Sequence, residues 1–158
     1  MSPAELTEAV GSLALLAGRA VVGAALILAA TAKIQGGHQR LLSAVLGYGL
    51  VRGRIASATA RVLPLGELVL GTLVLVGFQS RGAAAGAAVL VLIFSVAITL
   101  SLIRGRDNLC GCGDHVTPVQ WRLVRRNLFL LVLLVPLIAG GGGHFSLDAL
   151  ARVVSAPA

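Results

Sequence analysis

AAAGAAVLVLIFSVAITLSLI, which runs from Ala83 to Ile103, is a stretch of 21 residues without one charged side chain. A helix needs about 20 apolar residues to cross a hydrocarbon core about 30 Å thick. The stretch therefore predicts a transmembrane helix. The composition agrees, because 57% of the 158 residues are hydrophobic and only 12% are charged, against about 25% charged residues in soluble domains.

The rest of the composition excludes several classes of protein. Aromatic residues make up only 4% of the chain, and only two residues are cysteine, which excludes an aromatic-rich soluble core and a disulfide-stapled miniprotein. The net charge of +7 would suggest nucleic acid as the partner of a soluble protein. In a membrane protein it reports which links face the anionic cytoplasmic leaflet, so the expected partner is the lipid bilayer and no nucleic acid.

Three further apolar runs predict an all-α membrane protein, a four-helix transmembrane bundle in a single domain of residues 1–158. The spans are expected at about 13–32, 62–78, 83–103 and 119–139. Arg19 interrupts the first span and Glu67 lies within the second. The last span must begin near Val119 to be long enough, with Trp121 in the membrane interface. Pro136 should bend this helix, and the glycines from residue 140 should end it.

The link between the first two spans, residues 36–61, is expected to contain an amphipathic helix in the membrane interface. Apolar residues recur there near helical spacing, beside several arginines. The alternative is a solvated connector. The tail from Ser146 to Val154 predicts one more short amphipathic helix.

Positive charge is distributed unevenly between the two sides of such a bundle. Four spans place the first and third links on one side and both termini on the other. The first side carries ten Lys and Arg residues and the opposite side two, Arg81 and Arg152. The positive-inside rule then predicts that the first and third links, and with the third link both cysteines, face the cytoplasm. No Lys or Arg precedes the first apolar run, so we expect that run to remain as a span rather than to be a cleaved signal peptide.

The cysteines lie in the third link, residues 104–118, within the stretch NLCGCGDH. Cys110 and Cys112 can form a disulfide only if the backbone turns back on itself, and Gly111 and Gly113 provide the necessary φ freedom. Neighbouring arginines and His115 would favour the thiolate. A redox pair is the favoured interpretation. A soft-metal site with Asp114 and His115, or an inert turn, are the alternatives.

Ionisable residues inside the spans form a second group of candidates. Burying Arg19, Lys33 or Glu67 in a bilayer is costly, about 2.5 to 3.5 kcal/mol each on insertion scales. An ion pair that locks the first helix to the second is one interpretation. A proton relay or a quinone contact is the other. Gly82 and Gly86 form a small-xxx-small pattern that predicts close helix packing within the bundle.

Cys110-Gly111-Cys112-Gly113 is followed by Trp121 and by Arg126-Asn127. In these residues the sequence resembles the methylamine-utilisation MauE family, which is related to the DoxX group of small four-helix membrane proteins. The resemblance covers about residues 16 to 139. One departure is Gly113, where members of the family often have an aromatic residue.

The resemblance implies membrane thiol chemistry in support of protein maturation, with a thioredoxin-like partner. In the family's namesake the matured protein is the small subunit of methylamine dehydrogenase. We therefore expect a multi-pass protein of the bacterial cytoplasmic membrane that acts as a thiol–disulfide redox protein on a client protein. The resemblance also favours a cysteine link outside the cytoplasm, against the charge count.

Whether the chain is itself an enzyme stays open. With one cysteine pair, electrons must pass to or from another protein or a quinone, so quinone and a soft metal are the possible cofactors and neither is assigned. The alternative function is a non-enzymatic membrane anchor or assembly subunit, in which the Cys-x-Cys link is structural or binds metal.

Overall fold

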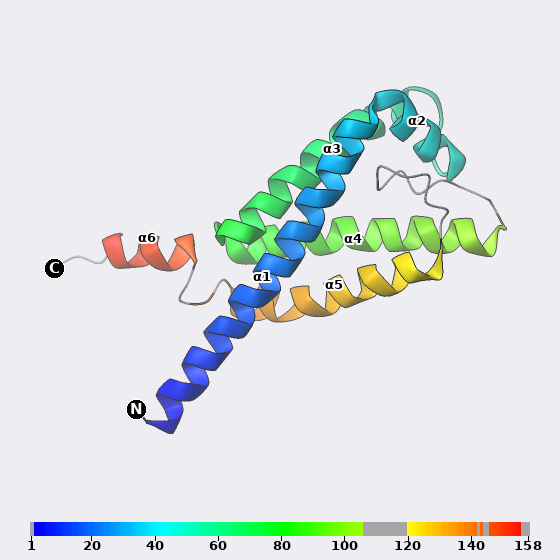
Figure 1. Ribbon diagram of the computed structural model, residues 1–158. Helices are drawn as coiled ribbons and strands as arrows, with labels where there is room; N and C mark the ends of the chain where they lie inside the picture. Colours follow the sequence, from blue (N-terminus) through cyan, green and yellow to red (C-terminus); the bar gives the residue numbers. More distant parts are fainter. Residues whose placement is uncertain (1, 106–119, 142, 144–145, 156–158) are drawn as a thin grey trace.

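The computed structural model describes residues 2–105, 120–141, 143 and 146–155 (Figure 1). Every regular element among them is a helix: α1 (Pro3–Gly36), α2 (His38–Gly47), α3 (Gly53–Val76), α4 (Ser80–Ile103), α5 (Trp121–Gly140) and α6 (Leu147–Ser155). Helices α1, α3, α4 and α5 are long and apolar enough to cross a membrane. The predicted all-α transmembrane bundle of four helices is confirmed.

Two of the spanning helices begin earlier than the apolar runs indicated. Helix α1 begins at Pro3 because Ser2 and Glu5 form a capping box around its first turn. Helix α3 begins at Gly53, so residues 53–61, which the sequence assigned to the first link, are its first turns. The reason is physical: hydropathy marks the part of a helix that lies in lipid, whereas backbone hydrogen bonding continues into the polar interface.

The amphipathic helix in the first link is confirmed as α2. It buries Leu41, Ala44 and Val45, and two of these pack with Ala56 and Ala60 of α3 in one apolar cluster. The short helix of the tail is also confirmed, as α6.

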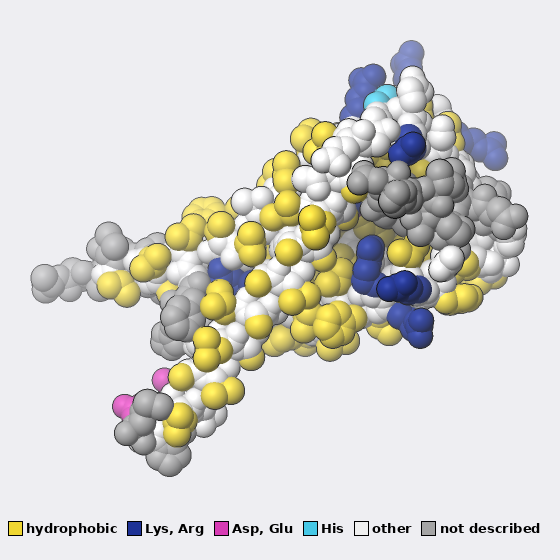
Figure 2. Space-filling view, in the orientation of Figure 1, with side chains coloured by type: hydrophobic (Ala, Val, Ile, Leu, Met, Phe, Trp, Pro, Cys, Tyr) yellow, Lys and Arg dark blue, Asp and Glu magenta, His cyan; other side chains and the backbone are white. Residues whose placement is uncertain are grey.

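The helices pack as two close pairs. Helix α1 lies along α3 and α4 lies along α5, and α3 also contacts α4. Their shared core contains small and branched residues, including Val22, Val74, Ala87 and Leu134. Large apolar side chains cover much of the outer surface (Figure 2), as expected of helices that face lipid.

Glycine brings α1 and α3 together, at positions that the sequence pattern did not indicate. A Cβ atom on Gly23 would lie 2.9 Å from the carbonyl oxygen of Gly71, so the two backbones are nearly in contact. The close packing predicted for Gly82 and Gly86 is wrong at Gly82, where nothing lies within 4 Å of a Cβ atom, and is confirmed at Gly86, where a Cβ atom would lie 2.9 Å from the Leu70 side chain of α3. Between α1 and α3 the two backbones themselves come close, because both helices carry glycine at the crossing point.

The two ends of the bundle differ. The start of α1, helix α6 and the turn between α3 and α4 lie at one end, whereas α2, the last residues of α4 and the first residues of α5 lie at the other (Figure 1). Lys and Arg gather at this second end (Figure 2). We call it the basic end.

Candidate functional site

The cysteine link connects α4 to α5, and the two helix ends that it connects lie at the basic end. Cys110, Gly111, Cys112, Gly113 and His115 lie outside the described residues. The other predicted site residues are Arg19, Lys33, Glu67, Arg126 and Asn127, and all of them lie in described helices.

Lys33 and Glu67 form a buried ion pair between α1 and α3. The Lys33 ammonium donates to both carboxylate oxygens of Glu67, at 2.6 and 2.7 Å. Both residues are almost wholly buried, at 4% and 1% exposure. Such a pair survives only when the hydrogen bonds compensate for the lost hydration of two charges. The ion-pair interpretation therefore describes the geometry, and the partner of Glu67 is Lys33.

Local structure places both groups. Lys33 lies in the last turn of α1, where the partial negative charge of a helix C-terminus favours a cation. Glu67 follows the buried Pro64 by three residues in α3. Proline cannot donate to the carbonyl one turn earlier, so the helical hydrogen-bond ladder is incomplete just before the acid.

Residues of the other two spanning helices, α4 and α5, surround this ion pair. Phe94 of α4 lies with its ring centroid 5.1 Å from the Lys33 ammonium, a distance that suits a cation–π contact. Asn127 and Arg126 of α5 line the same small cavity as the ion pair, and its volume is about 30 Å³. A cavity of this size has room for about one water molecule.

Arg126 gives the centre an excess of positive charge. Its guanidinium is close enough to Glu67 to interact with that carboxylate electrostatically, and it donates to the Asn127 side chain at 3.5 Å. Two cations therefore act on one buried acid. We call Lys33, Glu67, Phe94, Arg126 and Asn127 the polar centre.

Arg19 does not belong to the polar centre. Its guanidinium donates to the carbonyls of Val74 at 3.1 Å and Leu75 at 2.8 Å, in the last turn of α3. Glu67 lies seven residues earlier, about 10 Å along the helix. The sequence allowed either Arg19 or Lys33 to pair with Glu67. The prediction is wrong for Arg19, and Lys33 is the partner.

Asp148 is a structural residue that sequence reasoning missed. Its carboxylate accepts from the backbone N–H groups of Gln79 and Ser80, both at 2.8 Å, and from the Ser80 hydroxyl at 2.7 Å. It thereby caps the first turn of α4 from a position 68 residues further along the chain, and it also acts electrostatically on Arg19. No local sequence signal could have found a cap that the chain supplies from so far away.

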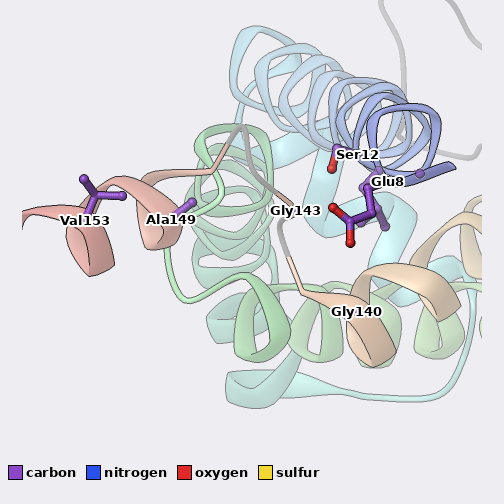
Figure 3. A pocket seen from close by; sticks show the side chains of 8 residues that line it. Glu8, Ser12, Gly140, Gly143, Ala149 and Val153 are labelled. Carbon is purple, nitrogen blue, oxygen red and sulfur yellow. The ribbon is translucent and has the colours of Figure 1, made fainter. Parts of the chain in front are cut away.

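An open groove lies at the same end of the bundle as Asp148. Residues of α1, of α6 and of the segment after α5 line it, including Glu8, Ser12, Gly143 and Ala149 (Figure 3). Its described lining residues form no cluster of reactive groups. More generally, among the described residues no three His, Cys, Asp or Glu side chains lie close enough together to hold a metal ion.

Comparison with known proteins assigns the chain to a family. The family model described as methylamine utilisation protein MauE matches residues 11–139. The chain belongs to the MauE family. The match contains the polar centre and both cysteines, and it leaves α6 with Asp148 outside.

Two curated MauE proteins are similar over much of the chain. Methylamine utilization protein MauE of Paracoccus denitrificans is 36% identical over 102 residues, which are 59% of this chain and 55% of that protein. The MauE protein of Methylophilus methylotrophus is 34% identical over 142 residues, 82% of this chain and 74% of that protein. The chain thus spans about half the length of the first relative. No solved structure matches.

Proposed function

We propose that this MauE-family protein is a membrane thiol–disulfide redox protein that supports the maturation of a partner protein. The observation that carries the proposal is that Cys110 and Cys112, the chain's two cysteines, fall within the residues that the family model matches. Gly111 lies between the two cysteines and Gly113 follows the second. These glycines allow a tight turn between the thiols.

The chemistry is a thiol–disulfide exchange. One thiolate of the pair attacks a sulfur of the partner's disulfide, an intermolecular S–S bond forms, and the partner's other sulfur leaves as a thiolate. The second cysteine then attacks the mixed disulfide. The pair ends as a disulfide and the partner as a dithiol, or the reverse when the chain oxidises its partner. His115 and the arginines of the basic end favour the thiolate form of the attacking cysteine.

The polar centre acts as a positioning element in this proposal. It ties α1 to α3 through the Lys33–Glu67 pair, and it reaches α5 through Arg126 and Asn127. The cysteine link ends where α5 begins. A polar centre that holds α5 in place therefore also holds one of the two ends of the link.

The partner in this proposal is a thioredoxin-like protein or a client protein with its own disulfides, and the location is the bacterial cytoplasmic membrane. The printed names of the relatives concern methylamine utilisation. By extension we propose that the client belongs to methylamine metabolism.

Covalent trapping tests the proposal. A Cys110→Ala or Cys112→Ala variant, expressed in cells and quenched with acid, should accumulate a mixed disulfide with its partner, since the resolving thiol is missing. Mass spectrometry of the trapped complex names the partner, and the Cys110→Ala/Cys112→Ala double variant is the control. If both single variants remain free of adducts and keep full activity in cells, the thiol pair has no redox role.

Complementation tests the biological context. Expressed in a Paracoccus denitrificans strain that lacks its own MauE, this chain should restore growth on methylamine, and the double variant should not. Growth with the double variant would instead support an assembly subunit whose cysteines are dispensable, and zinc or copper that copurifies with the wild-type chain would support a metal-binding link.

A further inference from the structure

An apolar cavity of about 160 Å³ lies beside the polar centre at the basic end. Helix α2 and the residues that follow it form one wall, with Leu41 and Tyr48, and α4 forms another, with Phe94 and Ala97. Lys33 is the one charged side chain among the described lining residues. The lining is otherwise almost entirely hydrocarbon.

The size of the cavity limits what it can hold. Pockets for drug-sized ligands usually measure about 300 to 1,000 Å³, whereas an apolar cavity of about 150 Å³ accepts a benzene ring. A single six-membered ring therefore fits, and any longer substituent must leave the cavity. Leu50 and Ile93 line the cavity and are also 45% and 59% exposed on the outer surface. The opening therefore faces the lipid-exposed surface, where an alkyl tail is soluble.

The side chains around the cavity favour a ring that carries an oxygen acceptor. Two N–H groups of the Lys33 ammonium are held by Glu67, and its next acceptor is the Ala29 carbonyl at 3.5 Å, the limit of a hydrogen bond. A ligand oxygen at the Lys33 end would be a better partner for the third N–H. The Phe94 ring, which also lines the cavity, offers an aromatic surface for stacking.

We infer that this cavity binds the ring of a membrane quinone, with one ring oxygen toward Lys33 and the alkyl tail in lipid. The binding site stands on the geometry alone, and its use as an electron acceptor rests on the proposed function. In that use, Cys110 and Cys112 lose two S–H bonds and form one S–S bond. The quinone takes up the two electrons and two protons and becomes a hydroquinone with two new O–H bonds.

Binding is measured on the Cys110→Ser/Cys112→Ser double variant in quinone-free nanodiscs of phosphatidylcholine and phosphatidylglycerol, so that no thiol can react. The probe is a decyl-substituted benzoquinone, and empty nanodiscs correct for partition into lipid. We expect saturable binding that Ala97→Phe weakens at least tenfold, because the new ring fills the cavity. Ala85→Phe on the exposed face of the same helix is the matched control and should bind as tightly as its parent.

Three results would overturn the inference. The first is an Ala97→Phe variant that folds and binds the quinone unchanged. The second is equal affinity for decylbenzene, which has the ring and tail without the oxygens and would show that the cavity accepts any hydrocarbon. If Ala97→Phe fails to fold, the parent is photolabelled with an azidoquinone, and adducts should map to residues 41–51 or 93–98. The third contradicting result is labelling that occurs only outside these residues.

A separate measurement distinguishes this inference from the proposed function. The reduced wild-type chain is mixed with the decyl benzoquinone, and hydroquinone formation is followed by absorbance together with the loss of free thiols. If the chain binds the quinone without this reaction, the cavity is still a quinone site, but the result contradicts the transfer of electrons from the thiol pair to the quinone.

Discussion

Lys33 and Glu67 show at the scale of single residues why charge can be placed inside this bundle. Each group alone would be an uncompensated charge in a low-dielectric interior, and each satisfies the other through two short hydrogen bonds. Glu67→Gln should therefore lower the free energy of unfolding by about 3 to 5 kcal/mol, because the Lys33 ammonium then stays buried without its counter-ion. Unfolding in detergent mixtures measures this loss.

The matched control separates the two bases that lie in α1. Adding Lys33→Gln to Glu67→Gln should restore part of the lost stability, since no buried charge then remains in the pair. Adding Arg19→Gln instead should lower stability further, because Arg19 holds the carbonyls of Val74 and Leu75 at the end of α3. Recovery with Arg19→Gln would contradict the pairing seen here.

At the scale of elements, the contact between α1 and α3 depends on two glycines. A methyl group on Gly23 would lie 2.8 Å from the Cβ atom of Leu75 and 2.9 Å from the Gly71 carbonyl, so the helices would have to separate. Gly23→Ala should cost about 1 to 3 kcal/mol of stability. Gly82→Ala, with open space around its Cβ position, should be neutral or slightly stabilising because alanine favours helix. Thermal unfolding of both variants in the same detergent is the test, and equal midpoints would contradict the close contact.

Helix α6 is attached to the bundle through the cap that Asp148 gives to α4. Asp148→Ala removes three hydrogen bonds to Gln79 and Ser80, and the loss of a helix N-cap costs about 0.5 to 2 kcal/mol. Amide hydrogen exchange should rise in residues 147–155 and in the first turn of α4. Glu5→Ala, which removes a cap at the start of α1, should raise exchange only there. Unchanged protection of α6 in the Asp148 variant would show that other contacts hold it.

The whole molecule carries its positive charge at one end, and this asymmetry predicts its orientation. Outside the apolar core of the bundle, ten Lys and Arg residues lie on the side of the first and third links, against Arg81 and Arg152 on the other side, and this count predicts that the basic end faces the cytoplasm. In a variant without native cysteines, Ser2→Cys should react with an impermeant maleimide in intact cells, and Arg54→Cys should be protected. The reverse labelling would place the cysteine link outside, where the family resemblance puts the partner, and would show that arginines at the basic end serve function rather than orientation.

The sequence by itself determined the fold class, the number of spans and the two amphipathic helices. A helix needs about 20 apolar residues to cross the lipid, and such runs, for example residues 83–103, can be recognised in the sequence. Interfacial helices show through their spacing, as in α2. The cysteine pair and the family resemblance were also legible, because they are local strings of residues.

The tertiary structure decided which residues meet. That Glu67 pairs with Lys33, that Gly23 faces Gly71 and that Asp148 caps α4 depends on the rotation and crossing of helices. Periodicity fixes which side of a helix is apolar, but several crossings bury the same apolar faces equally well. Long-range polar contacts and close glycine contacts select among these crossings, and their partners lie 34 to 69 residues apart in the chain.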